Sequence, residues 1–250
     1  TLDAGIDIIL SLANQAEIWF ILGNHDIYFK HSNEIHSLKF LELINHNNIH
    51  LISKTSEINI DGKDILFIPW LGSIKTSKKF DYIFGHLNIT ENSIKHFFSK
   101  IKKPEEIDLS FLKSYMTENE IQEFIDEKQV EEFVNNQKFE PKSIFEFVKD
   151  NGIIFSGHFH MNDSFQRNGK QFIYIGAPRE LNASDEGNPK GFYFVNPGKN
   201  EVTFIKNTFS PKYMTIFYTK IKMDGQEAFQ KFLQENKNNY IKIIFDIDLE

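Results

Sequence analysis

The sequence predicts an α/β fold built on parallel strands. Segments with helical spacing of apolar residues alternate with short, continuous apolar runs, and such runs are typical of strands covered on both faces. Three of these runs end in a glycine and a histidine, at Gly23-Asn24-His25, Gly85-His86 and Gly157-His158. Because ligand sites in open α/β sheets lie at the carboxyl ends of the strands, the pattern also predicts a site there.

The chain opens with a helix and a buried strand. Residues 1–15 are expected to be helical, because their apolar residues recur on one face, and residues 17–22 form the strand that follows. This order matches the second half of a β-α-β unit, so we expect the chain to be a fragment that lacks its first strands. Residues 24–30 are polar and irregular, and residues 38–44 suggest a short helix.

The remaining strands are marked by turn signals. Asp61-Gly62 and Asn168-Gly169 each separate two strand-like runs and predict hairpin turns, and Asn196-Pro197-Gly198 predicts a turn before the strand 201–206. The expected strands are 50–52, 57–60, 65–69, 80–84, 152–156, 164–167, 171–175, 191–195 and 201–206. From Ser210 the pattern changes to one β-α-β unit, with a strand at 213–221, a helix at 224–236 and a strand at 240–248.

A charged segment interrupts this arrangement. Residues 91–150 are poor in glycine and show helical spacing, which predicts a helical insertion with helix starts near Pro104 and Pro141. Its last part, 142–150, is predicted to be a helix that leads into the strand at 152–156. The insertion carries 9 Lys against 14 Asp and Glu, or −5, and therefore dominates the formal net charge of −7.

Composition excludes several classes of protein and site. The 250 residues include no cysteine, so disulfides and thiolate metal sites are excluded and any metal ion must be held by nitrogen and oxygen ligands. No apolar run approaches the length of a membrane span, and we expect no membrane partner. The net negative charge argues against a generally basic nucleic-acid binder.

The glycine–histidine pattern gathers side chains that bind metal ions. In extended backbone His158 and His160 point the same way, since residues i and i+2 share a face. Neutral imidazoles and amide oxygens suit borderline divalent ions such as Mn²⁺. We therefore expect one cluster at the strand ends, formed by Asn24, His25, His86, His158 and His160.

Simpler structural explanations exist for several of these residues. Asn24-His25 is also explained as an ordinary strand-end turn that Asp26 closes, because Asn and Asp favour turns. Trp70 either packs in the core or lines the site. Arg179 either contacts a phosphate bidentately or makes a surface salt bridge.

The three motifs, in this order, resemble those of the calcineurin-like metallophosphoesterases. Further segments are similar to the SbcD-type DNA-repair nucleases of that superfamily, which include the phage recombination endonuclease subunits. These segments are Ile27-Tyr28-Phe29-Lys30, Phe67-Ile68-Pro69-Trp70, Tyr174-Ile175-Gly176-Ala177-Pro178 and residues 185–192. The resemblance covers about residues 1–208 outside the insertion.

This resemblance implies a four-layer α-β-β-α sandwich over residues 1–208 and the start of a small α+β cap, which contacts DNA, over residues 209–250. It also implies two divalent metal ions, usually Mn²⁺. By position, the second ion would be bound by Asn24, His86 and His158, and the first by His160. His25 would contact the scissile phosphate and assist the leaving oxygen, and Asp26 would orient His25.

The resemblance fails at the start of the chain. The family's Asp-x-His and Gly-Asp-x-x-Asp motifs precede the helix with which this sequence opens, so three expected ligands are missing. Asp3 and Asp7 lie on a helix that should pack on the sheet, and they do not replace them. We therefore expect this fragment alone to be inactive.

The expected function is that of a metal-dependent DNA exo- or endonuclease subunit. The resemblance implies a role in recombination or repair with an SMC-like ABC ATPase of the SbcC type, in the cytoplasm of a bacterium or a phage-infected host, and it is compatible with a homodimer. The alternative enzyme is a metallophosphatase or phosphodiesterase that acts on small molecules. The alternative without activity is an adaptor that keeps the fold.

Overall fold

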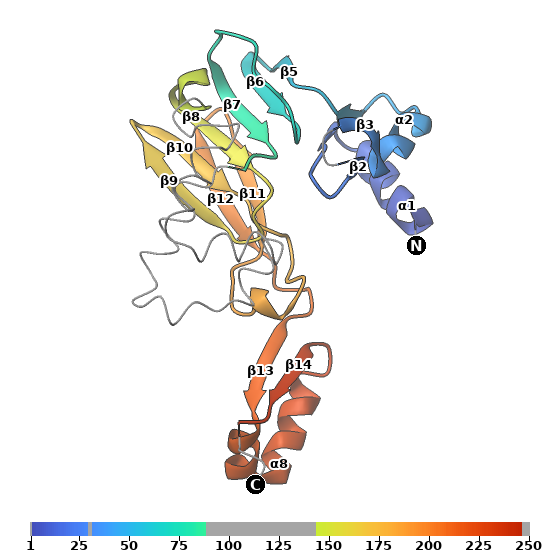
Figure 1. The fold of residues 1–250 in the computed structure, drawn as a ribbon, viewed down its shortest axis with the longest axis vertical. Helices are drawn as coiled ribbons and strands as arrows, with labels where there is room; N and C mark the ends of the chain where they lie inside the picture. The colour runs from blue at the N-terminus through green and yellow to red at the C-terminus, as the bar shows by residue number, and fades with distance from the viewer. Residues whose placement is uncertain (1, 30–31, 89–143, 247–250) are drawn as a thin grey trace. The chain divides into compact units, whose positions relative to one another are not determined.

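The computed structural model describes residues 2–29, 32–88 and 144–246 (Figure 1). Most of the insertion predicted at 91–150 lies outside these residues. The described part forms two compact units. The first contains the residues up to 88 together with 144–158 and 164–174, and the second contains 159–163 and 175–246. The predicted boundary after residue 208 stays a prediction.

A six-stranded sheet is the centre of the first unit (Figure 1). Its spatial order is β5-β6-β7-β8-β10-β9; β6, β7, β8 and β10 run parallel to one another, and β5 pairs antiparallel with β6. The bounds are β5 Ser56–Ile60, β6 Lys63–Ile68, β7 Phe80–Gly85, β8 Val148–Ser156, β9 Asp163–Arg167 and β10 Lys170–Tyr174. The mixed α/β class is thereby confirmed, whereas the four-layer sandwich stays a prediction.

The sheet is held by apolar side chains that are adjacent in its register. Phe67, Phe84 and Phe155 are partners on β6, β7 and β8, and their rings stack with centroids 5.7 and 5.2 Å apart. Trp19 extends the row, 5.2 Å from Phe67. The neighbouring side chains Ile68, Ile83 and Ile154 are fully buried. This burial explains why the strands are nearly continuous apolar runs in the sequence.

The N-terminal elements belong to the same unit. Helix α1 leads into β1, which pairs in parallel with β4, and β2 and β3 form an antiparallel hairpin. The bounds are α1 Leu2–Ala13, β1 Ile18–Ile21, β2 Ile27–Phe29, β3 Ser32–His36, the 3₁₀ turn η1 Ser37–Lys39, α2 Phe40–Ile44 and β4 Ile49–Ile52. The Trp70 amide, just after β6, donates to the Leu22 carbonyl at 2.8 Å and links β1 to the large sheet.

The second unit contains two small sheets. An antiparallel pair is formed by β11 and β12, and β13 and β14 are parallel strands joined by α8, as the β-α-β pattern predicted. The bounds are the 3₁₀ turn η4 Ala183–Asp185, β11 Gly191–Asn196, β12 Glu201–Lys206, β13 Tyr213–Phe217, α8 Tyr218–Glu235 and β14 Tyr240–Ile244. Helix α8 is interrupted by Gly225, whose φ is 82°.

Three predicted elements differ from the structure. The segment 24–30 was expected to be irregular, but β2 lies within it. The strand predicted at 213–221 ends at Phe217, and helix α8 begins there because Asp246 accepts hydrogen bonds from the Thr219 amide and hydroxyl. The helix predicted at 142–150 is wrong in its described part, which is the 3₁₀ turn η3 (Phe145–Phe147) followed by β8. The short run of buried apolar residues in this segment is compatible with a helix and with a strand, so the sequence pattern did not distinguish them.

No helix within the described residues combines the length and the apolar character that a membrane span requires.

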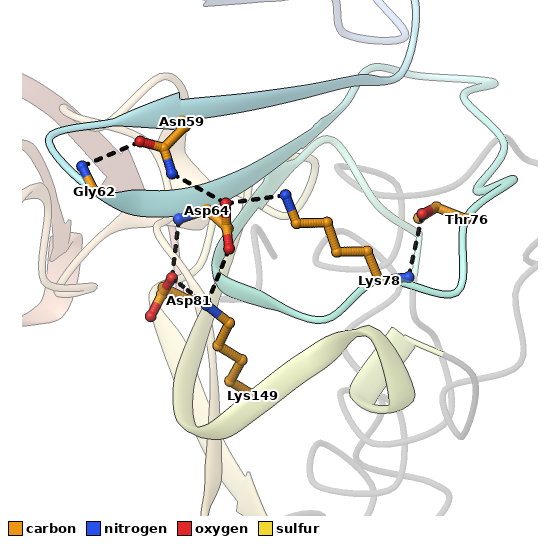
Figure 2. Close-up of polar contacts among 7 residues, drawn as sticks. All are labelled: Asn59, Gly62, Asp64, Thr76, Lys78, Asp81 and Lys149. Carbon is orange, nitrogen blue, oxygen red and sulfur yellow. Dashed lines mark hydrogen bonds and ion pairs between the residues drawn. The ribbon is translucent and has the colours of Figure 1, made fainter.

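A network of ion pairs links the amino-terminal ends of β6, β7 and β8 (Figure 2). The Lys149 ammonium lies 2.8 Å from Asp81 and 3.1 Å from Asp64, and Lys78 lies 3.0 Å from Asp64. Hydrogen bonds from Lys78, Asn59 and Lys149 hold the pKa of the Asp64 carboxyl well below its ordinary range. Burial raises the pKa of Asp81, but hydrogen bonds from Lys149 and the Asp64 amide outweigh it, so this pKa is also lowered.

Replacing Lys149 by methionine is expected to flatten the dependence of stability on acid pH. The pKa values of Asp64 and Asp81 are lower in the folded chain than in the unfolded chain. Their contribution to the free energy of unfolding is therefore complete above the unfolded pKa, and it is lost as the pH falls through the folded pKa values. The stability of the wild type should therefore fall between about pH 5 and pH 2, and less so in Lys149→Met. Urea unfolding at several pH values measures this. Lys79→Met is the control, and equal slopes in all three proteins would contradict the prediction.

Candidate metal centre

The carboxyl ends of β6, β7 and β8 meet at one edge of the sheet. Gly85 is in register with Ile68 on one side and with Ser156 on the other. The ladder continues one residue further, because the His86 amide donates to Ile68 and the Gly157 amide donates to Gly85, both at 2.9 Å. This parallel register brings the second and third glycine–histidine motifs together, as the sequence predicted.

Three of the predicted ligands lie at this edge. His86 Nε2 is 2.8 Å from Asn24 Oδ1, in the loop that follows β1. The rings of His86 and His158 are edge to face, with centroids 5.4 Å apart and an interplanar angle of 74°. All three side chains are half-buried. Residues from three strand ends, 24, 86 and 158, thus form one group that we call the strand-end cluster.

Two glycines make room for the His86 ring. A Cβ on Gly23 would lie 2.9 Å from His86 Cε1, and a Cβ on Gly157 would lie 2.9 Å from His86 Nδ1. Real Cβ atoms do not approach other atoms this closely. The glycines of the first and third motifs are therefore needed for the histidine of the second motif to occupy its place.

The backbone of His158 is strained and its ring is supported by an aromatic side chain. Its φ is 89°, a value that non-glycine residues rarely adopt and that costs of the order of 1–3 kcal/mol. Trp70 stacks on the His158 ring with centroids 5.1 Å apart and touches His86 edge-on at 5.9 Å. Trp70 thus lies against the site, where it fixes the orientation of both imidazoles.

Asp26 closes the turn that carries Asn24. Its Oδ2 accepts a hydrogen bond from the Gly23 amide at 2.8 Å, and its Oδ1 accepts one from the Ser37 hydroxyl at 3.3 Å. These contacts agree with the simpler explanation given above, in which Asp26 closes a strand-end turn. His25 is exposed, and no hydrogen bond joins it to Asp26 among the described residues. The predicted orientation of His25 by Asp26 stays a prediction.

His160 and Arg179 belong to the second unit, so their positions are described within it. The His160 carbonyl accepts hydrogen bonds from the Ala177 amide at 2.9 Å and from Lys190 Nζ at 2.8 Å. Lys190 also pairs with Asp185 at 2.6 Å, and both side chains are almost fully buried. A buried ion pair thus anchors the loop that carries His160. The anchoring of this loop by Lys190 and Asp185 was not predicted from the sequence, although both residues lie in the segment 185–192 that carries the resemblance.

The strand-end cluster fits part of a metal site. His86 Nε2 and Asn24 Oδ1 share a hydrogen bond of 2.8 Å, which holds these two donor atoms close to the separation of about 3 Å between adjacent corners of an octahedral site with bonds of about 2.1 Å. The donors are an amide oxygen and imidazole nitrogens, the ligands that Mn²⁺, Fe or Zn accept when no thiolate is present. Among residues that the structure describes, no three His, Asp or Glu side chains are grouped closely enough to hold an ion by themselves.

Replacing Gly157 by alanine is expected to weaken metal binding without unfolding the chain. The added Cβ would overlap the His86 ring, which is also confined by Gly23, so the imidazole must shift. Displacing a ligand in this way should reduce Mn²⁺ affinity about 10- to 100-fold. Calorimetric titration measures the affinity. Gly5→Ala is the matched control, because its Cβ would meet nothing within 4 Å, and equal affinity in the two variants would contradict the prediction.

Comparison with known proteins gives one distant relationship. No family model matches the chain. Exonuclease subunit 1 of Enterobacteria phage T4 is 26% identical to it over 197 residues, which cover 75% of this chain and 44% of that protein. The chain therefore spans less than half the length of this relative. It is a distant homologue of a protein described as an exonuclease subunit.

Proposed function

We propose that this chain is part of a metal-dependent nuclease subunit that hydrolyses phosphodiester bonds in DNA. The observation that carries the proposal is the convergence of Asn24, His86 and His158 at one edge of a parallel sheet. The name of the phage T4 relative supports a nucleic-acid substrate. The motif resemblance supports the metallophosphoesterase assignment and the choice of Mn²⁺.

In this proposal the strand-end cluster holds one divalent ion, and His160 contributes to a second. Divalent ions held by these residues would neutralise charge on the phosphate and activate a water for attack. Trp70 keeps both imidazoles oriented through its ring contacts. His25 is exposed beside Asn24, so its imidazole N–H is free to donate to the leaving oxygen of a bound substrate.

The proposed partners follow from the same sources. The relative is described as a subunit, which supports action within a complex. An SMC-like ABC ATPase is the partner that the motif resemblance implies, and a homodimer is compatible with it. Both are proposed for the full-length protein.

A cleavage assay on the full-length protein tests the function. We expect end-labelled linear DNA to be cleaved with Mn²⁺ and to remain intact with EDTA. If a chromogenic diester is hydrolysed and DNA is not, the small-molecule phosphodiesterase is the correct assignment. If neither substrate is hydrolysed with Mn²⁺, Mg²⁺, Fe²⁺ or Zn²⁺ while the protein is folded, the non-catalytic adaptor is correct.

A further inference from the structure

The second unit contains a pocket whose lining includes none of the strand-end cluster residues. Its volume is about 410 Å³, and it lies between the loop 179–190, the end of β12 and the start of β13. Six of its lining residues are charged: Arg179, Glu180, Glu186, Lys190, Lys206 and Lys212. These charges determine what the pocket can bind, and they divide into two groups.

The first group is already neutralised or engaged. Lys190 forms the buried ion pair with Asp185 described above. Glu180 Oε2 accepts a hydrogen bond from the Tyr213 amide at 2.5 Å, and Glu186 Oε1 accepts one from the Thr215 amide at 2.8 Å. The Thr215 hydroxyl donates to the other oxygen of Glu186, so the two glutamates fasten β13 to the loop.

The second group consists of cations that remain available. Arg179, Lys206 and Lys212 are exposed, and within the described part of the chain none of them makes an ion pair. Leaving out Lys190, whose charge Asp185 neutralises, the lining carries three cations and two carboxylates, or +1, whereas the whole chain carries −7. This local reversal of sign favours an anionic ligand at this place.

The wall of the pocket between β12 and β13 is preformed. Asn207 donates to the Pro178 carbonyl and to the Ser210 hydroxyl, both at 2.8 Å, and its own Oδ1 accepts from the Phe209 and Ser210 amides. These bonds fix the backbone that connects Lys206 to Lys212. The ligand would therefore meet a fixed frame that needs only side-chain adjustment.

We propose that this pocket binds the phosphate groups of nucleic acid through Arg179, Lys206 and Lys212. The choice of ligand rests on the proposed function. The arginine supplies a planar fork that matches two phosphate oxygens, and the lysines supply point charges. The same chemistry would hold either a phosphate of the DNA strand or that of a released mononucleotide.

Binding measured without hydrolysis tests this proposal. The triple variant Arg179→Gln, Lys206→Gln, Lys212→Gln is compared with Lys199→Gln, Lys237→Gln, Lys242→Gln, which removes three exposed cations of the same unit outside the pocket. The probe is a labelled single-stranded oligonucleotide in EDTA, followed by anisotropy at several salt concentrations. A parallel titration uses adenosine monophosphate. Thermal melting checks that each variant is folded, and Lys206→Gln alone is the milder variant.

The pocket variant should bind the oligonucleotide at least about tenfold more weakly, with a salt slope lower by about 2 to 3, and Lys206→Gln should lower the slope by about 1. If instead only adenosine monophosphate binding is lost, the phosphate is that of a mononucleotide. Equal losses in the pocket and control variants would overturn the proposal. The binding test does not depend on hydrolysis. If the pocket binds DNA but the cleavage assay described above finds no hydrolysis, the proposed nuclease function is rejected and the proposed binding site is retained.

Discussion

Replacing His158 by alanine should reduce Mn²⁺-dependent cleavage by the full-length protein by more than about 100-fold. The imidazole that would be lost is one of the nitrogen ligands that we propose in the strand-end cluster, and no neighbouring side chain replaces it within the described edge of the sheet. The fold should persist, because the His158 side chain is only half-buried and lies beyond the end of β8. Cleavage rates and thermal melting measure the two effects.

A glycine at position 158 separates the effect of losing the imidazole from the effect of the strained backbone. His158→Gly should be as inactive as His158→Ala, yet more stable than it by about 1 kcal/mol, because glycine adopts a φ of 89° without cost. His46→Ala is the control for histidine removal, since His46 lies in the turn before β4. Cleavage retained by both His158 variants would remove His158 from the proposed site.

Replacing Lys190 by methionine should destabilise the chain by about 3–5 kcal/mol, the cost of leaving one member of a buried ion pair without its partner. The Lys190 ammonium contacts both Asp185 and the His160 carbonyl, and the two side chains of the pair are 4% and 3% exposed. Methionine keeps the volume and removes the charge. Urea unfolding of the chain measures the loss.

An exposed ion pair in the same unit provides the comparison. Lys220 and Asp224 are 2.8 Å apart on α8, with side chains 65% and 44% exposed, so Lys220→Met should cost less than about 1 kcal/mol. A double variant, Lys190→Met with Asp185→Leu, should recover part of the lost stability, because it removes the uncompensated charge. A cost for Lys190→Met as small as that for Lys220→Met would show that the buried pair does not anchor the loop.

Much of the fold follows from local patterns in the sequence. The hairpin turns at Asp61-Gly62 and Asn168-Gly169 form as predicted, since these residues take the positive φ values of 49° and 78°, and of 51° and 74°. The β2–β3 hairpin could not be predicted in the same way, because β2 has only three residues, too few for a periodic pattern to distinguish strand from loop. The start of α8 depends on Asp246, which is distant in the sequence.

The candidate site was predictable in part. Parallel strands place their carboxyl ends together, so the glycine–histidine motifs of β7 and β8 had to converge. Contacts between side chains are not visible in a sequence, and the stacking of Trp70 on His158 is such a contact. The positive φ of His158 and the engagement of Asp26 with Gly23 likewise arise from the packed loops. The position of His160 relative to the strand-end cluster stays a prediction.

Pulsed electron paramagnetic resonance of Mn²⁺ bound to the protein tests the central claim most directly, because it detects nitrogen nuclei coupled to the ion. The proposed site predicts coupling to imidazole nitrogen in the wild type, and a weaker nitrogen signal in both His86→Ala and His158→Ala. A bound ion whose spectrum shows oxygen ligands alone, or a nitrogen signal that is unchanged in both variants, would contradict the account.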